Sequence, residues 1–391
     1  MRLGIGVVVF LFYLGYMIPV HGGVVTVTST MALIAVIYKC VKHRRIELEF
    51  FPKTIAVALI IFFVGLLVSS FVVGDKESYA YIGTLLYWMS PLVVAYLLTC
   101  YYKKSIDYVG MAATIALLVT GMGSVYQYAF LATHRATSIY NNPNMIASVL
   151  DVTIPLCVLY FVYLVKEKNT ENIKLVTTGV AVIVSVMAQI LSGSRGGMLG
   201  VTIGLMLASL LYYLRQKEYK KLVVALMACA CIGGVFTVIN DTKMKGIHRP
   251  YDMERIYLLK SSYNMWNDHK MFGVGLEHWK IEYPKKYILP QAKEPKLDMP
   301  HNIFAYFFST TGVVGGIGFC ILMLSIFGYL YSNLEFTKGG FVAFAMMWAF
   351  LAISIHGQFD VGLRTKYVMR IFCATLGFTM AYINMRAVGQ K

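Results

Sequence analysis

The sequence predicts an all-α polytopic membrane protein, and three observations support this fold class. Only 14% of the 391 residues are charged, against about 25% in typical soluble domains. Hydrophobic residues make up 58% of the chain, and the mean hydropathy is +0.65. The few charges cluster between long apolar runs. Such runs cross a bilayer as helices, because a helix satisfies its backbone hydrogen bonds internally.

The apolar runs define about twelve expected transmembrane spans, each near the roughly 20 residues that cross hydrocarbon. Their expected bounds are 3–20, 23–38, 54–73, 79–101, 107–131, 143–165, 173–191, 196–214, 221–240, 303–331, 339–356 and 366–385. Only Arg2 precedes the first run and no small-residue cleavage site follows it, so we expect a retained span rather than a signal peptide. Residues 1–391 are therefore expected to form a single transmembrane domain.

Lysines and arginines in the connections predict the orientation. If the N-terminus is cytoplasmic, the inner connections hold about half of the 35 basic residues. The short outer connections hold only Lys76, Arg135, Arg195, Arg364 and Lys366. This bias favours two cytoplasmic termini and places the long polar segment 241–302, between spans 9 and 10, on the outer side. The net charge of +16 is thus mostly a signature of topology and does not indicate nucleic-acid binding.

The outer loop 241–302 is the only sizeable polar segment of the chain. Within it, residues 252–270 are expected to form a short amphipathic helix. One face of this helix would carry Ile256, Leu259, Tyr263 and Trp266. We expect that face to pack on the span bundle, with a position in the lipid interface as the alternative.

Two outer helix starts carry candidate functional residues. Arg195 lies in the stretch SGSRGG, where small residues let a ligand approach the backbone at the open N–H groups of a helix start. A guanidinium there can grip a phosphate with two parallel hydrogen bonds, although an interfacial snorkelling arginine would fit equally well. Pro300 marks the start of a second helix and places His301 and Asn302 in its first turn. An anion could be held there beside a proton acceptor.

Other outer polar residues have a structural and a functional interpretation. Arg135 precedes a turn in which Asn142 and Asn144 flank a proline, a pattern that is also ordinary capping chemistry. Arg255 follows Glu254 on the loop helix, where a surface ion pair is the simple alternative to a ligand contact.

The remaining polar groups indicate no further chemistry. His356, Asp360 and Arg364 in the last outer turn are expected to form a solvated connection rather than the rim of a cavity. Asp151 is the nearest approach to a buried acid within a span. The outer histidines lack paired metal-ligand spacing, the seven cysteines suggest no disulfide framework, and hydrolase, nucleotide-binding and zinc-protease motifs are absent.

Taken together, four stretches resemble the O-antigen ligase family, whose members share a domain with O-antigen polymerases. The stretches are RATSIYNNPNMIAS at 135–148, LSGSRGGMLG at 191–200, ERIYLLKSSYNMWNDHKMFGVG at 254–275 and the His-Asn, nine residues, Gly-x-x-Gly pattern over 301–315. In this order they are specific for the superfamily, and less so for ligase over polymerase.

The resemblance implies a GT-C-like glycosyltransferase in the bacterial inner membrane, with its active site at the periplasmic face. Such an enzyme would transfer O-antigen from undecaprenyl diphosphate to a sugar hydroxyl of lipid A core, with inversion and without a metal ion or other cofactor. Arg195 and Arg255 would bind the diphosphate and His301 would activate the acceptor hydroxyl. Further substrate contacts are expected from Arg135, Asn142, Asn144, Ser194 and Asn302. We expect a monomer; O-antigen polymerase is the alternative function, followed by a lipid-linked glycan transporter.

Overall fold

The computed structural model describes residues 2–19, 22–44, 46–47, 51–74, 76–102, 104–167, 170–228, 230–231, 250–334 and 340–388. All regular elements in these ranges are helices, and this confirms the predicted fold class. The α-helices are α1 (Arg2–Met17), α2 (Gly22–His43), α3 (Lys53–Val73), α4 (Lys76–Met89), α5 (Pro91–Tyr101), α6 (Ser105–Phe130), α7 (Pro143–Lys166), α8 (Asn172–Leu191), α9 (Arg195–Gln216), α11 (Pro250–Asp268), α12 (Trp279–Glu282), α13 (Ile303–Ser332), α14 (Gly340–His356) and α15 (Lys366–Val388). A π-helical turn, Tyr283–Tyr287, follows α12, and a 3-10 turn, Gly362–Arg364, precedes α15.

Most predicted spans coincide with described helices. Within the described residues, nine helical segments are long and apolar enough to cross a membrane, with α4 and α5 counted together as Lys76–Tyr101, and α1 and α14 are shorter apolar helices. The fourth predicted span is divided, because α4 ends at Met89 and Pro91 begins α5. Of the ninth predicted span, 221–228 is helical, whereas most of 229–240 lies outside the described residues, as does 241–249 of the outer loop.

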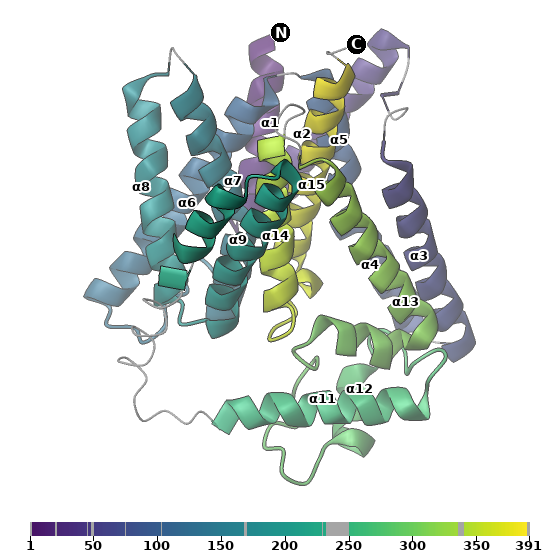
Figure 1. Cartoon of the computed structure of the whole chain (residues 1–391). Helices are drawn as coiled ribbons and strands as arrows, with labels where there is room; N and C mark the ends of the chain where they lie inside the picture. Colours follow the sequence, from purple (N-terminus) through teal and green to yellow (C-terminus); the bar gives the residue numbers. More distant parts are fainter. Residues whose placement is uncertain are drawn as a thin grey trace.

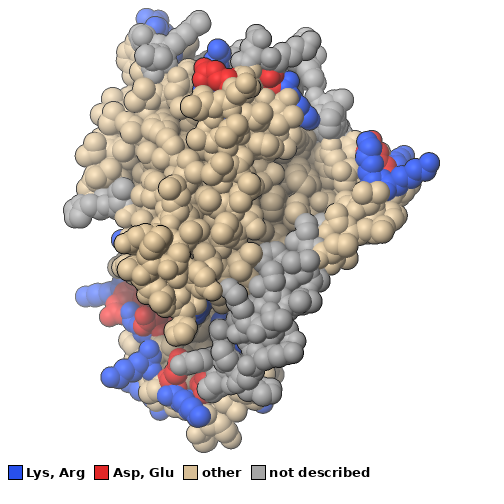
Figure 2. Space-filling view, turned by 90° about the vertical axis from the view of Figure 1, so that its left-hand side faces the viewer, with Lys and Arg blue, Asp and Glu red and all other residues tan. Residues whose placement is uncertain are grey.

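The helices form a bundle with two chemically different ends. Both termini lie at one end, and α11 and α12 lie at the opposite end (Figure 1). In the bundle, α13 packs along α3, α14 along α9 and α15 along α5. On the face shown in Figure 2, charged side chains gather toward the two ends, and the middle is largely uncharged. This pattern is the one expected of a protein that spans hydrocarbon.

Helix α13 bends at Gly312, and the bend receives the chain that follows α11. Gly312 has φ 62° and ψ −160°. The backbone N–H groups of Val274 and Gly275 donate to carbonyls just before the bend, Ser309 O and Thr310 O, at 3.1 and 2.8 Å. After the bend, Val313 N–H donates to Lys270 O at 2.8 Å. The loop is therefore fixed to the tenth predicted span by backbone hydrogen bonds.

The predicted loop helix forms as α11, but its packing face was predicted wrongly. Ile256, Leu259 and Tyr263 are 44%, 39% and 60% exposed, and of the predicted face only Trp266 is half-buried, with its ring 6.4 Å from the Phe308 ring of α13. The buried face instead carries Leu258, Ser261, Ser262 and Met265. This face packs inside the loop itself, where Trp279 Nε1 donates to Ser262 Oγ at 3.0 Å. The apolar spacing misled because two buried serines, Ser261 and Ser262, occupy the centre of the true contact face.

Replacing Gly312 by alanine should destabilise the fold. A Cβ there would lie 2.3 Å from the backbone of Met271, and the positive φ is unfavourable for an L-residue. We expect a loss on the order of 2 kcal/mol, seen as a lower thermal midpoint in detergent. Gly328→Ala in the same helix is the control, since a Cβ there meets nothing within 4 Å. Equal midpoints for both variants would contradict this role of Gly312.

Candidate active site

A polar cavity of about 350 Å³ lies between α9, α11 and the start of α13. Its lining brings together Arg195, Arg255 and His301, which are distant in the sequence. Arg135, Asn144 and Ser194 of the predicted substrate-contact set also line it, and Glu254 and Glu294 contribute acidic groups. Asn142 and Asn302 are absent from the lining. The cavity is thus rich in guanidinium groups and contains an imidazole.

Arg195 owes its place to the local structure of the SGSR turn. Gly193 adopts φ +61°, a backbone conformation that suits glycine. Ser194 then caps α9, and its side chain accepts a hydrogen bond from Gly197 N–H at 3.4 Å. Arg195 is the first residue of α9.

A glycine pattern that the sequence interpretation missed brings α9 close to α14. Gly196, Gly200 and Gly204 recur every four residues, so they share one helix face. A Cβ at Gly200 would lie 2.6 Å from Ala352 O, and one at Gly196 would lie 2.8 Å from His356 Cδ2. Small residues at this spacing let two membrane helices approach closely. They place the start of α9 beside the end of α14.

Arg135 joins the two outer turns that flank the cavity. Its Nε donates to Ser192 O at 2.9 Å, and its Nη2 donates to Asn144 Oδ1 at 2.8 Å. Asn142 instead caps α7, since its side chain accepts from Asn144 N–H at 2.7 Å. Arg135 and Asn144 are therefore held together at the cavity wall, whereas the Asn142 side chain caps α7.

Arg255 is not engaged by its neighbour Glu254. The Glu254 carboxylate accepts two hydrogen bonds from the Lys293 N–H, at 3.0 and 3.1 Å. Among the described residues Arg255 forms no ion pair, so the predicted alternative of a Glu254–Arg255 pair is not realised. A half-buried guanidinium in a polar cavity can instead attract an anionic ligand.

His301 is oriented by an acidic residue from the last outer turn. The prediction that His301 and Asn302 lie in the first helical turn was wrong, because α13 begins at Ile303 and Asn302 is its cap. His301 adopts φ +53° before the cap, and its Nδ1 lies 3.2 Å from Asp360 Oδ1. Asp360 Oδ1 also accepts Val361 N–H at 2.8 Å. The adjacent Asn302 caps α13 through Ala305 N–H, and its Nδ2 donates to Gln358 Oε1 at 3.0 Å. With Nδ1–H directed at the carboxylate, Nε2 is the ring atom that can accept a proton.

Asp360 is held in its charged form. Burial raises the pKa of this carboxyl, but the hydrogen bond and charge of His301, the charge of His356 and the Val361 N–H outweigh burial and lower the pKa to about 2. A permanent carboxylate stabilises positive charge on the imidazole that it contacts. Asp360 therefore suits His301 for taking up a proton.

The prediction of a solvated connection after α14 was wrong. His356 is 1% exposed, and the side chains of Asp360 and Arg364 are 17% and 11% exposed. Arg364 binds Glu277 of the outer loop at 2.7 Å and stacks on the Tyr306 ring at 4.7 Å. Each group is buried because it has a partner from a distant part of the chain, and spacing alone does not reveal such partners.

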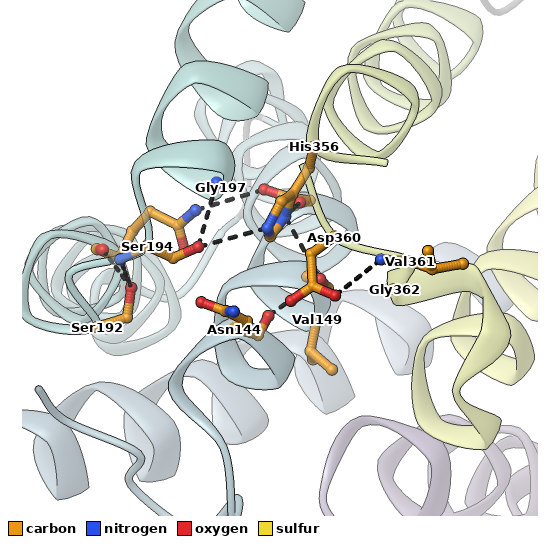
Figure 3. Close-up of polar contacts among 12 residues, drawn as sticks. Asn144, Val149, Ser192, Ser194, Gly197, His356, Asp360, Val361 and Gly362 are labelled. Carbon is orange, nitrogen blue, oxygen red and sulfur yellow. Dashed lines mark hydrogen bonds and ion pairs between the residues drawn. The ribbon is translucent and has the colours of Figure 1, made fainter. Parts of the chain in front are cut away.

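A buried hydrogen-bond chain lies behind the cavity wall (Figure 3). Asp151 Oδ2 is 2.6 Å from His356 Nδ1, and His356 Nε2 is 3.4 Å from Ser194 Oγ. Asp151 is fully buried in α7. The sequence had marked it as the nearest approach to a buried acid, but gave no partner for it.

Acidification should remove part of the stability that Asp360 provides. A carboxyl whose folded pKa is lowered stabilises the fold above its unfolded pKa of about 3.9, and this contribution disappears as pH falls through about 2. We expect the wild type to lose on the order of 2 kcal/mol between these values, measured by denaturant unfolding in detergent. Asp360→Asn should be less stable at pH 6 and change less over this window. If the free energy of unfolding of Asp360→Asn falls as steeply with acidification as that of the wild type, the role of Asp360 is contradicted.

Comparison with known proteins gives one match, to part of the chain. The family model described as O-Antigen ligase matches residues 180–320, a range that contains Arg195, Arg255 and His301. No curated protein matches the chain. Enzymes of this family are of the O-antigen ligase or polymerase type. The matched residues 180–320 include nine of the eleven cavity-lining residues and the α11 loop, and over this part the chain is similar to the O-antigen ligase family.

Proposed function

We propose that this protein transfers O-antigen polysaccharide from undecaprenyl diphosphate to a sugar hydroxyl of lipid A core. The observation that carries the proposal is the convergence of Arg195, Arg255 and His301 on one cavity. Two guanidinium groups suit a diphosphate, and an imidazole with a carboxylate partner suits a hydroxyl that must lose its proton.

The arginines act on the leaving group. A lipid diphosphate would keep its polyprenyl tail in hydrocarbon and present its phosphates to the cavity. Negative charge on the diphosphate grows as its bond to the sugar breaks. Arg195 and Arg255 therefore stabilise the transition state more than the ground state, and this difference lowers the barrier. In this mechanism the guanidinium groups supply the positive charge at the diphosphate.

His301 acts on the acceptor. The acceptor oxygen attacks the anomeric carbon while its proton passes to Nε2 of His301, and Asp360 stabilises the resulting imidazolium. The bond between the anomeric carbon and the diphosphate oxygen breaks, and the diphosphate leaves with the electron pair. A single displacement of this kind inverts the anomeric configuration.

The proposed location is the bacterial inner membrane, with the cavity at the periplasmic face. The bias of Lys and Arg to the inner connections supports this orientation. Both termini lie at the end of the bundle opposite to α11, as two cytoplasmic termini would require (Figure 1). Residues 1–391 would then form one transmembrane domain, with 241–302 as its periplasmic loop.

Loss of any of the three groups should abolish most transfer. We expect Arg195→Ala, Arg255→Ala and His301→Ala each to lower the rate on the order of 10²–10³-fold in proteoliposomes that contain donor and acceptor. Arg215→Ala is the matched control, because Arg215 lies in the last turn of α9, far from the cavity. Wild-type rates in an Arg195 or His301 variant would remove that residue from the mechanism.

The product distinguishes the proposed ligase from a polymerase, since the family match applies to both. We expect glycan on lipid A core in one step when both lipids are supplied. Chain ladders on undecaprenyl diphosphate, formed without lipid A, would identify a polymerase instead. If neither product forms while lipid-linked glycan still crosses the vesicle membrane, the protein would be a transporter.

A further inference from the structure

His356 contacts both halves of the proposed catalytic machinery without lining the cavity. Its side chain reaches Ser194, which caps the helix that begins with Arg195. Its backbone carbonyl accepts hydrogen bonds from the N–H groups of Phe359 and Asp360, at 2.8 and 2.9 Å. One residue therefore lies between the turn of a diphosphate-binding arginine and the carboxylate partner of the proposed base.

The hydrogen-bond partners define the proton positions on the buried ring. Nδ1 of His356 faces the Asp151 carboxylate at 2.6 Å and Ser148 Oγ at 3.3 Å. The Ser148 hydroxyl donates its own proton to Asn144 O at 3.0 Å, so both neighbours of Nδ1 are acceptors. Nδ1 must therefore carry a proton, and in the neutral ring Nε2 accepts the hydroxyl proton of Ser194.

This arrangement fixes the rotation of the Ser194 hydroxyl. With its proton directed at His356, the oxygen lone pairs remain available to Gly197 N–H, the group that Ser194 caps. The cap in turn fixes the first turn of α9, where Arg195 begins. The His356 imidazole, held by the Asp151 carboxylate, thus positions Arg195 through the Ser194 hydroxyl.

Two glycines at the start of α9 leave space for the His356 imidazole. Cβ atoms at Gly196 and Gly197 would lie 2.8 and 3.3 Å from the His356 ring. A buried carboxylate and imidazole are costly compared with apolar residues of similar size, so their presence points to a requirement other than stability.

We propose that His356, anchored by Asp151, is a positioning residue that fixes the position of the Arg195 turn relative to the His301–Asp360 pair. The inference rests on the proposed function and deepens it. The side chain of His356 positions Arg195 through Ser194, whereas its backbone carbonyl accepts the hydrogen bond of the Asp360 N–H. Substitution of the side chain should therefore affect only Arg195.

A double-mutant cycle tests the side-chain path. We expect Ser194→Ala and His356→Phe each to raise the KM for the lipid diphosphate donor about tenfold, with a fall in kcat, because the displaced Arg195 loses its contact with the diphosphate in the ground state as well as in the transition state. The double variant should show the same tenfold rise in donor KM, since both changes interrupt the same chain of hydrogen bonds. The pH profile of kcat should match the wild type, because the carbonyl of residue 356 remains. Ser124→Ala is the control, a buried serine bonded to its own helix.

Rescue at Asp151 provides a second test that does not remove the imidazole. Asp151→Asn keeps an oxygen to accept Nδ1–H. Its new N–H₂ replaces the oxygen that now accepts from Gln189 Nε2 at 3.4 Å, and it can donate to Gln189 Oε1, which has no hydrogen-bond partner among the described residues, once the Gln189 amide turns over. We expect the donor KM of this variant to stay within about threefold of wild type. Asp151→Val has no acceptor and should match His356→Phe.

The outcomes separate this inference from the proposed function. If the effects of Ser194→Ala and His356→Phe multiply, or if donor KM is unchanged in either, the positioning role is wrong even though the wild type transfers glycan. Equal donor KM values in Asp151→Asn and Asp151→Val would also overturn it. If the wild type transfers no glycan with any donor, the proposed function itself fails.

Discussion

The hydrogen bond between Asp151 and His356 is the interaction on which the cavity depends. A carboxylate with no exposure to solvent is tolerated only when it is bonded, and here the imidazole of a distant helix is its partner. That bond joins α7 to α14, and the far side of the same ring reaches the start of α9. Three helices thereby converge at one level of the bundle, and the cavity opens beside them. A polar contact sets this geometry, whereas apolar packing holds the spans together.

Close approach of the α9 and α14 backbones makes this arrangement of the His356 ring possible. The α9 glycines remove the side chains that would separate α9 from α14, so the imidazole can lie against backbone. The same absence of side chains lets the SGSR turn sit where Arg195 faces the cavity. One sequence feature thus serves both helix association and the site. The hydrogen bonds at the Gly312 bend and the Arg364–Glu277 pair attach the loop that contains α11 to the bundle, and Arg255 of that loop lines the same cavity as Arg195.

Local patterns were enough to predict much of the site. The helix start at Arg195 was visible from Ser194 and the glycines around it. The capping role of Asn142 was likewise visible beside Pro143. Such features could be predicted because a helix end is decided by residues that lie within a few positions of it. The start of α13 was placed too early, because the helix begins at Ile303 with Asn302 as its cap and not at Pro300. Asp360 and His356 were misjudged because their burial depends on His301 and Asp151, which lie 59 and 205 residues away.

By itself the sequence determined an all-helical membrane bundle, the bounds of most spans and the helix start that carries Arg195, because hydropathy and capping are local properties. Only the tertiary structure decided that these residues and Arg255 share one cavity, that Asp360 orients His301, and that α11 buries its serine face and leaves Ile256, Leu259 and Tyr263 exposed. The physical reason is that a hydrogen bond or a packed face needs a partner, and here each partner comes from a remote part of the chain.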